Sequence, residues 1–161
     1  MRWLDGPLGF YVSAHARSIH VIDTYNGKLK VATQGADGKY GAWRTLAGSG
    51  AIGSADGEAS QASFTQPHGM DVAPNAGFAY IGDTFAMCVR SVELATGRVA
   101  TVAGRCGQGG HRDVVAGGGS SCLDARFNHG ACSIAIADPR RPASGCVSQT
   151  LPMRCRSQCT R

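Results

Sequence analysis

The clearest candidates for chemistry in this sequence are its seven cysteines, two of which flank a glycine-rich loop. Cys106 and Cys122 stand on either side of residues 107–121. A disulfide that closes a loop of this length stabilises a fold by roughly 3 kcal/mol. We therefore favour a disulfide between Cys106 and Cys122, which would indicate an extracellular or luminal parent protein. The alternative is two thiols in a reducing compartment, since the cysteine count is odd and we find no export signal at the start of the chain.

Three cysteines near the end of the chain superficially offer ligands for zinc. Cys155 and Cys159 are four residues apart, and Cys146 lies upstream of them. A structural zinc site requires four ligands at compact spacing, whereas the nearest histidine is His129. We therefore expect no zinc site in this segment.

Two histidines occupy equivalent places, each directly before a glycine at the start of an apolar strand. They are His68 and His129, and Asp71 and Asp83 follow the first of them. Such a set could face a ligand or hold a metal ion. The alternative, which we favour, is that a polar residue suits the turn before the glycine.

Acidic residues suggest two further roles. Asp56 and Glu58 lie in a glycine-containing turn, but two carboxylates are too few ligands for a calcium site. Asp83, followed by Thr84, ends a predicted strand, where its carboxylate can accept backbone N–H groups of the turn that follows. No Ser-His-Asp or Cys-His order stands out, and no pair of carboxylates flanks a recognisable pocket. We predict no catalytic, cofactor-binding or metal-binding residues, and no cofactor.

Composition and charge narrow the class of protein. With 23 glycines and 7% aromatic residues among 161, the chain suits short strands and tight turns better than a helical bundle. No run is apolar enough for a transmembrane helix. The net charge of +5 arises in residues 139–161, because residues 1–138 hold 11 Lys and Arg against 11 Asp and Glu. The basic segment has no aromatic residue and no periodicity, so we expect a disordered tail and no nucleic-acid binding.

Four short strands follow one another in the middle of the chain. Apolar alternation and turn residues predict them at 68–74, 78–84, 87–94 and 98–104. Their connections are only a few residues long, which fits antiparallel neighbours and excludes helical crossovers. The product is a four-stranded meander, and such a sheet cannot bury both of its faces alone.

The four-stranded unit recurs along the chain. The Leu-Ala-Gly at Leu46 returns as Val-Ala-Gly at Val102, and the Ala-x-Phe motif at 62–64 returns at 125–127. Each copy of that motif is followed by His-Gly and an apolar strand. The spacing of about 56 to 70 residues is a little above that of one propeller blade. Self-similar four-stranded units predict an all-β fold of the β-propeller type, with antiparallel blades packed around a channel.

The unit at 46–104 resembles the NHL-repeat family of β-propellers. That family combines a Phe followed by Pro-x-Gly, an apolar strand, an aromatic-apolar-x-Asp-Thr motif and a charged strand that ends before a Thr-Gly turn. The matching residues are Phe64, Pro67, Gly69, Tyr80, Asp83, Thr84, Arg90, Thr96 and Gly97. The resemblance is partial for 10–48 and for 102–138.

The resemblance predicts an incomplete propeller. We divide the chain into a partial blade at 1–48, a full blade at 49–104 and the start of a third at 105–138, which together form an NHL-like segment at 1–138. The basic Cys- and Arg-rich tail follows at 139–161. In the first unit Pro7-Leu8-Gly9 runs straight into Phe10, so we expect the innermost strand to be missing, with residues 13–15 where Asp-Thr should stand. Because propellers close with four to eight blades, we expect either a fragment of a larger protein, which we favour, or self-association of several copies.

The expected function is non-catalytic. The repeat predicts a scaffold that interacts with a protein or carbohydrate ligand, within a larger extracellular or membrane-anchored protein. The resemblance also supplies an alternative, because some proteins of this propeller architecture are lyases with a zinc ion held by histidines at the channel mouth. In that case His68 and His129 would face the channel of a metal-assisted lyase or hydrolase.

Overall fold

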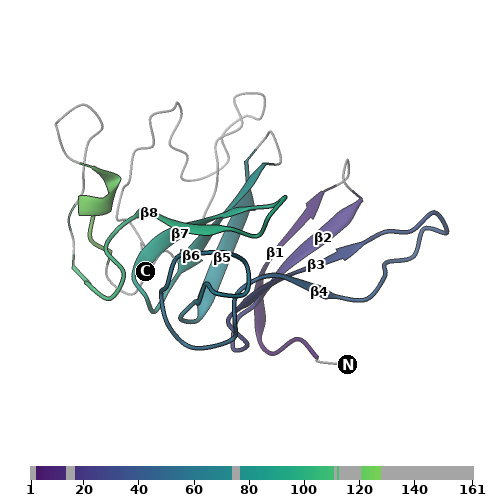
Figure 1. Cartoon of the computed structure of the whole chain (residues 1–161), viewed down its shortest axis with the longest axis horizontal. Helices are drawn as coiled ribbons and strands as arrows, with labels where there is room; N and C mark the ends of the chain where they lie inside the picture. The colour runs from purple at the N-terminus through teal and green to yellow at the C-terminus, as the bar shows by residue number, and fades with distance from the viewer. Residues whose placement is uncertain (1–2, 14–16, 74–76, 111, 113–120, 128–161) are drawn as a thin grey trace.

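The described chain folds into two four-stranded antiparallel sheets (Figure 1). The computed structural model describes residues 3–13, 17–73, 77–110, 112 and 121–127. The first sheet contains β1 (Pro7–Ser13), β2 (Ser18–Asp23), β3 (Lys28–Thr33) and β4 (Arg44–Ala47). The second sheet contains β5 (Pro67–Val72), β6 (Phe78–Asp83), β7 (Cys88–Glu93) and β8 (Val99–Ala103), and the short 3₁₀ turn η1 (Cys122–Asp124) follows. The described residues include no helix long and apolar enough to cross a membrane.

The second sheet confirms the four strands that the sequence predicts between residues 68 and 104. Each strand begins and ends within two residues of its predicted bounds. Tight turns join neighbouring strands: the N–H of Met87 donates to the carbonyl of Thr84 at 3.2 Å, and the N–H of Gly97 donates to the carbonyl of Glu93 at 2.7 Å. The result is a simple meander in which sequence neighbours are also spatial neighbours.

The first sheet also has four strands, so the expectation that its innermost strand is missing is wrong. Pro7 begins β1 opposite Asp23, in the same way that Pro67 begins β5 opposite Asp83. The Asp-Thr motif of the first unit is therefore at Asp23, not at residues 13–15. Placing residues 13–15 at the Asp-Thr position matches β1 with β6 instead of β5, which is one strand out of register, because all of these alternating strands look alike in sequence.

With the correct register, the two units are related by a constant shift. Strands β1 to β3 correspond to β5 to β7 at a spacing of 60 residues, and β4 corresponds to β8 at 56. The difference arises in the connection from the third strand to the fourth, which is longer in the first sheet. Even the irregularity of pairing recurs, after Leu29 in β3 and after Val89 in β7.

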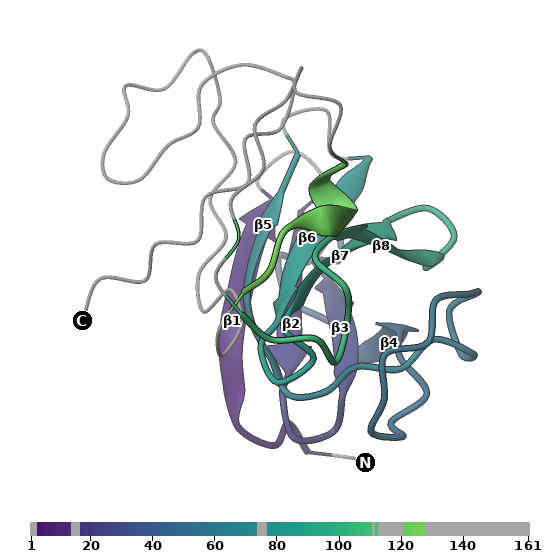
Figure 2. The same cartoon turned by 90° about the vertical axis from the view of Figure 1, so that its left-hand side faces the viewer.

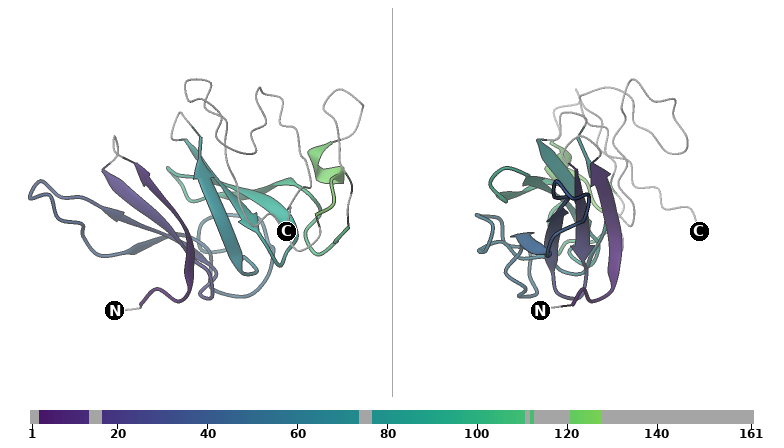
Figure 3. Two further views of the ribbon diagram at one scale, coloured as in Figure 1. Left: turned by 180° about the vertical axis from the view of Figure 1, so that it is seen from behind. Right: turned by 90° about the vertical axis from the view of Figure 1, so that its right-hand side faces the viewer.

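The two sheets pack against each other through a shared apolar core, and β1 lies against β5 (Figure 1, Figure 3). Ala62 and Phe64, from the segment that connects the sheets, are buried within this core, and Phe64 is only 1% exposed. The strands contribute the remaining buried side chains. These are Ile22, Leu29, Val31, Leu46, Ala47, Met70, Val72, Ala79, Ile81, Val92 and Val99.

A second copy of the Ala-x-Phe motif covers the other side of the second sheet. Ala125 and Phe127 are buried there, and η1 lies beside β8, on the side away from the first sheet (Figure 1, Figure 2). In both copies the Phe ring lies against a glycine that ends the fourth strand. Gly48 and Gly104 have φ angles of 98° and 77°, and a Cβ atom on either would lie within 3.2 Å of the ring. Only glycine combines that backbone conformation with such close contact.

The opposite face of the first sheet carries exposed apolar side chains. Leu8, Phe10 and Val12 alternate along β1 and are 56%, 72% and 52% exposed. Their counterparts on β5 include Met70 and Val72, which are 8% and 5% exposed because the first sheet covers them. The predicted self-association would require such a face.

We expect Phe64→Ala to lower the free energy of unfolding by about 3–5 kcal/mol, because this ring fills the core between the sheets. Phe10→Ala is the matched control, since the same deletion at an exposed ring should change stability by less than about 0.5 kcal/mol. Urea denaturation followed by circular dichroism measures both values. Equal losses in the two variants would show that Phe64 does not link the sheets.

Candidate functional site

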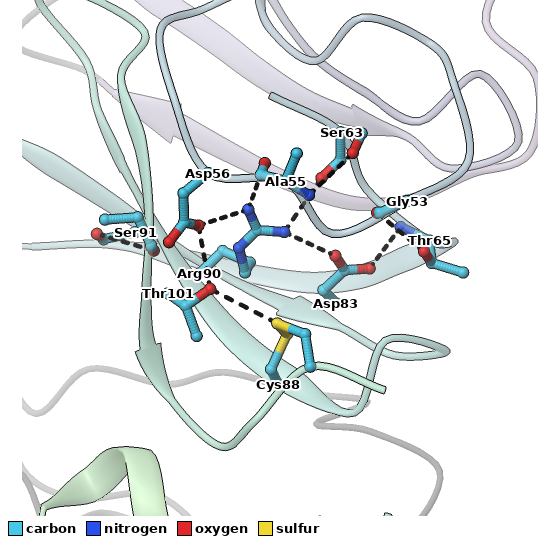
Figure 4. Close-up of a disulfide and its surroundings, with 12 residues drawn as sticks. Gly53, Ala55, Asp56, Ser63, Thr65, Asp83, Cys88, Arg90, Ser91 and Thr101 are labelled. Atoms are coloured by element: carbon cyan, nitrogen blue, oxygen red, sulfur yellow. Dashed lines mark hydrogen bonds and ion pairs between the residues drawn. A yellow bond between two sulfur atoms is a disulfide. The ribbon is translucent and has the colours of Figure 1, made fainter. Parts of the chain in front are cut away.

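The fully buried side chain of Arg90 binds the segment that connects the two sheets and holds it against the second sheet (Figure 4). The guanidinium of Arg90, on β7, contacts the carboxylates of Asp83 at 3.2 Å and Asp56 at 2.7 Å. It also donates to the carbonyl oxygens of Ser63 and Ala55, at 3.1 and 2.8 Å. Its charge and most of its donors are therefore matched within the protein, which gives Arg90 a structural role.

Asp83 extends this network to the segment before β5. One of its oxygens accepts the backbone N–H of Thr65 at 2.8 Å, while the other contacts Arg90. The predicted role as an acceptor is confirmed, but the N–H group belongs to the segment that precedes β5 and not to the turn that follows Asp83. Burial raises the pKa of Asp83 to about 6, against the opposing effects of the Thr65 N–H and the positive charge of Arg90.

The first sheet repeats this arrangement with a lysine in place of the arginine. Asp23 and Lys30 form a buried ion pair, and Asp23 accepts the backbone N–H of Asp5 at 2.6 Å. Asp5 lies two residues before Pro7, as Thr65 lies two residues before Pro67. The aspartate therefore fixes the entry of the chain into each sheet.

A disulfide joins Cys88 to Cys106 (Figure 4), which corrects the predicted pairing of Cys106 with Cys122. Cys88 begins β7, and Cys106 follows β8 closely. The N–H of Gly107 donates to the carbonyl of Ala86 at 2.7 Å, which returns the chain after β8 to the β6–β7 turn. Cys106 thereby reaches the start of β7 before the glycine-rich loop begins.

A cleft of about 230 Å³ opens between the two sheets, and the inner face of the first sheet forms its floor. One row of side chains crosses all four strands of this sheet, because the residues are direct partners in the register of β1, β2, β3 and β4. The members of this row are Tyr11, His20, Val31 and Arg44. The next row is formed by three hydroxyl residues, Ser13, Ser18 and Thr33. The opposite wall consists of Val72 and Leu94.

Two polar atoms of side chains that line this cleft are buried without a hydrogen-bond partner among the described residues. They are Ser18 Oγ and His20 Nδ1, and the two side chains are 5% and 7% exposed. Burial lowers the pKa of His20, and the positive charge of Arg44 lowers it further. The imidazole is therefore neutral at pH 7, with one donor and one acceptor nitrogen.

Among the described residues that line the cleft, Arg44 supplies the only charge. Its side chain is exposed at the start of β4, and no hydrogen bond or ion pair joins it to another residue in the described part of the chain. The lining thus combines one cation, several hydroxyl groups, a neutral imidazole and apolar walls. Few precisely placed polar groups among apolar ones are typical of small-molecule sites.

The corresponding row of the second sheet has different chemistry. By the same register it consists of Asp71, Tyr80, Ser91 and Ala100. An aspartate replaces the tyrosine of the first sheet, and an alanine replaces Arg44. The combination of His20 and Arg44 is therefore not required by the four-stranded unit itself.

The residues that the sequence suggested as metal ligands do not converge. His68, on β5, packs edge-on against Phe85 with ring centres 6.2 Å apart. Asp56 and Glu58 form separate ion pairs, with Arg90 and Arg98. Within the described ranges, no three His, Cys, Asp or Glu side chains are grouped to hold a metal ion. The second histidine, His129, and the three terminal cysteines, Cys146, Cys155 and Cys159, lie outside the described residues.

No sequence motif indicates the cleft. The residues of its floor are separated by up to 33 positions, from Tyr11 to Arg44, and they form rows only in the correct strand register. An alignment with a shift of 60 residues for the first three strands and 56 for the fourth would have shown Tyr11, His20 and Arg44 as departures from the second unit.

Comparisons with known proteins support the propeller-type fold. No protein-family model matches the chain. NHL repeat-containing protein 2 of Gallus gallus is 31% identical over 94 residues, which are 58% of this chain and 12% of that protein. Two solved structures, described as auxiliary nutrient binding proteins of Bacteroides thetaiotaomicron and Bacteroides ovatus, match with TM-scores of 0.67 and 0.66 at 20% and 22% identity.

These two matches cover 81% and 79% of this chain, and 32% and 31% of the solved structures. The chain therefore spans about a third of the length of those structures and about an eighth of the curated relative. The predicted resemblance to NHL repeats is confirmed: the chain is a distant homologue of an NHL repeat-containing protein, folded as blade-like sheets.

We expect Arg90→Met to lower the free energy of unfolding by about 3–5 kcal/mol at pH 8, because the carboxylate of Asp83 remains buried without its cation. The loss should be smaller at pH 5. The stability that arises from the raised pKa of Asp83 is fully present below about 3.8 and is lost as the pH rises through about 6. Because the guanidinium of Arg90 lowers the pKa of Asp83, removing it should raise that pKa. The stability would then be lost only at a higher pH.

Urea denaturation at both pH values tests this expectation. Arg98→Met is the matched control, because its ion pair with Glu58 is exposed and should contribute less than about 1 kcal/mol. A loss in Arg90→Met that is the same at pH 5 and pH 8 would contradict the assigned role of Asp83.

Replacing both Cys88 and Cys106 by Ser should lower stability by about 3 kcal/mol, since the disulfide closes a segment with a sequence separation of 18. Cys122→Ser should leave the midpoint of urea denaturation nearly unchanged. Thermal and urea unfolding under non-reducing conditions measure both effects. A large loss in Cys122→Ser, together with a disulfide-linked peptide that contains Cys122, would restore the pairing predicted from the sequence.

Proposed function

We propose that this chain is a non-catalytic propeller segment that binds a protein or carbohydrate ligand in the cleft between its two sheets. The observation that carries the proposal is a pair of buried polar atoms, Ser18 Oγ and His20 Nδ1, which belong to two side chains that line this cleft and have no partners among the described residues. Buried polar groups are nearly always hydrogen-bonded, so such atoms call for an explanation. A ligand with complementary groups supplies one.

The chemistry of the cleft favours binding over catalysis. Ser18 and His20 are close in sequence, but they form no hydrogen bond with each other, and no carboxylate among the described lining residues orients the imidazole. A serine nucleophile requires both contacts. Two of the solved structures with a similar fold are auxiliary nutrient binding proteins. Their description as binding proteins supports a binding role for this chain.

Immobilised panels of glycans and peptides, probed with the full chain, test the proposal. We expect a bound ligand to be lost with Ser18→Phe, which fills the cleft and introduces the residue found at the corresponding position, Phe78. Ser60→Phe, at an exposed site in the connection between the sheets, is the control and should bind as before. Mass spectrometry of the ligand after incubation should show it unchanged.

Two results would contradict the proposal. Binding that Ser18→Phe leaves intact would remove the cleft from the site, and turnover of the ligand would make the chain an enzyme. Stoichiometric zinc in the purified chain, measured by elemental analysis, would favour the metal-assisted lyase or hydrolase instead.

A further inference from the structure

We infer that the cleft takes a sugar acid of monosaccharide size, whose carboxylate binds Arg44 and whose hydroxyl groups bind Ser18 and His20. This inference rests on the proposed function and specifies its ligand class. It follows from three properties of the lining: its single charge, the hydrogen-bonding character of its buried atoms and its size.

The charge of the cleft requires one anionic group. Within the described ranges, Arg44 is exposed, has no ion-pair partner and is the sole charged residue that lines the cleft. A guanidinium presents parallel N–H groups that match the two oxygens of a carboxylate. A phosphate, with about two negative charges, would leave charge uncompensated in a cleft with one cation.

The buried atoms require groups that both donate and accept hydrogen bonds. Ser18 has a hydroxyl, and the neutral His20 has one donor and one acceptor nitrogen. A sugar hydroxyl matches both residues, whereas an ammonium ion only donates and a carboxylate only accepts. His20 and Arg44 lie two strands apart in the same row, which is about 10 Å between their backbones. The carboxylate and the hydroxyl groups must therefore belong to one ligand that extends along the row.

The size and the walls of the cleft limit the ligand to a single ring. Its volume of about 230 Å³ lies below the 300–1,000 Å³ of pockets for drug-sized molecules. Tyr11, Val72 and Leu94 provide apolar surface beside the polar row, and the C–H face of a sugar ring can be buried against such surface.

The corresponding positions of the second sheet carry residues of different charge. Asp71 and Ala100 stand where the first sheet has Tyr11 and Arg44. The corresponding row of the second sheet would repel a carboxylate and offer it no guanidinium. It also shows that alanine is compatible with the fourth strand of the unit, so Arg44→Ala should fold normally.

Isothermal titration of the full chain with glucuronate, with glucose and acetate as reference compounds, tests the inference. We expect glucuronate to bind at least about ten times more tightly than either reference, because only it carries both kinds of group. Arg44→Ala should weaken glucuronate binding by about 10- to 100-fold, the range of a hydrogen bond to a charged group. Arg105→Ala, which removes a partly exposed ion pair with Asp124, is the control and should bind like the wild type.

Ser18→Ala provides a second test, because it deletes one hydroxyl without changing the charge, and it should weaken the binding of glucuronate. Circular dichroism confirms that each variant is folded. Glucuronate that binds no more tightly than glucose, or with the same affinity to Arg44→Ala, would overturn the sugar-acid assignment. If another ligand of the panel is lost with Ser18→Phe in that case, the proposed function stands and only its ligand class fails.

Discussion

Each sheet of this protein depends on a buried ion pair between the aspartate that ends its second strand and a cation on its third strand. An ion taken out of water costs several kcal/mol unless a partner and hydrogen bonds compensate it. In the second sheet Arg90 meets this requirement with Asp83, Asp56 and two backbone carbonyls of the connecting segment. The ion pair therefore also determines where the connection lies.

The position of that connection determines how the two sheets meet. The guanidinium of Arg90 lies 5.4 Å from the centre of the Phe64 ring, and Phe64 with Ala62 fills the core between the sheets. Beyond this core, His20 and the hydroxyl residues of the second row replace apolar side chains on the inner face of the first sheet. The cleft lies where the apolar contact between the sheets gives way to these polar residues. The polar side chains of the cleft come from the first sheet, whereas the shape of the cleft depends on both sheets.

Much of the architecture could be predicted from the sequence, because it follows from local patterns. Alternating apolar residues and turn glycines located β5 to β8 within two residues, and the repeated Ala-x-Phe motif indicated stacked units. Register could not be predicted in the same way: β1 and β6 both alternate, so the first unit was aligned one strand out and appeared incomplete. The Asp23–Lys30 ion pair marks the correct register of the first unit, but it is recognised only by comparison with the Asp83–Arg90 pair of the second sheet.

The disulfide and the candidate site depend on contacts between distant residues. Loop length favoured Cys122 as the partner of Cys106, but a backbone hydrogen bond from Gly107 brings Cys106 to Cys88 instead. The cleft combines residues of the five strands β1 to β5 with Leu94, which follows β7, and these residues form no motif in the sequence. Such sites emerge from the pairing of strands, which a single sequence does not specify.

The central claim is that the two sheets form one cooperative unit through their shared core. Both tryptophans, Trp3 and Trp43, lie in the first unit, so their fluorescence reports on that unit, while far-UV circular dichroism reports on both sheets. Urea unfolding followed by the two signals should give coincident transitions, as expected for a single cooperative domain. A fluorescence transition that is complete at a lower urea concentration than the circular dichroism transition would show that the first sheet unfolds independently, and would contradict the account.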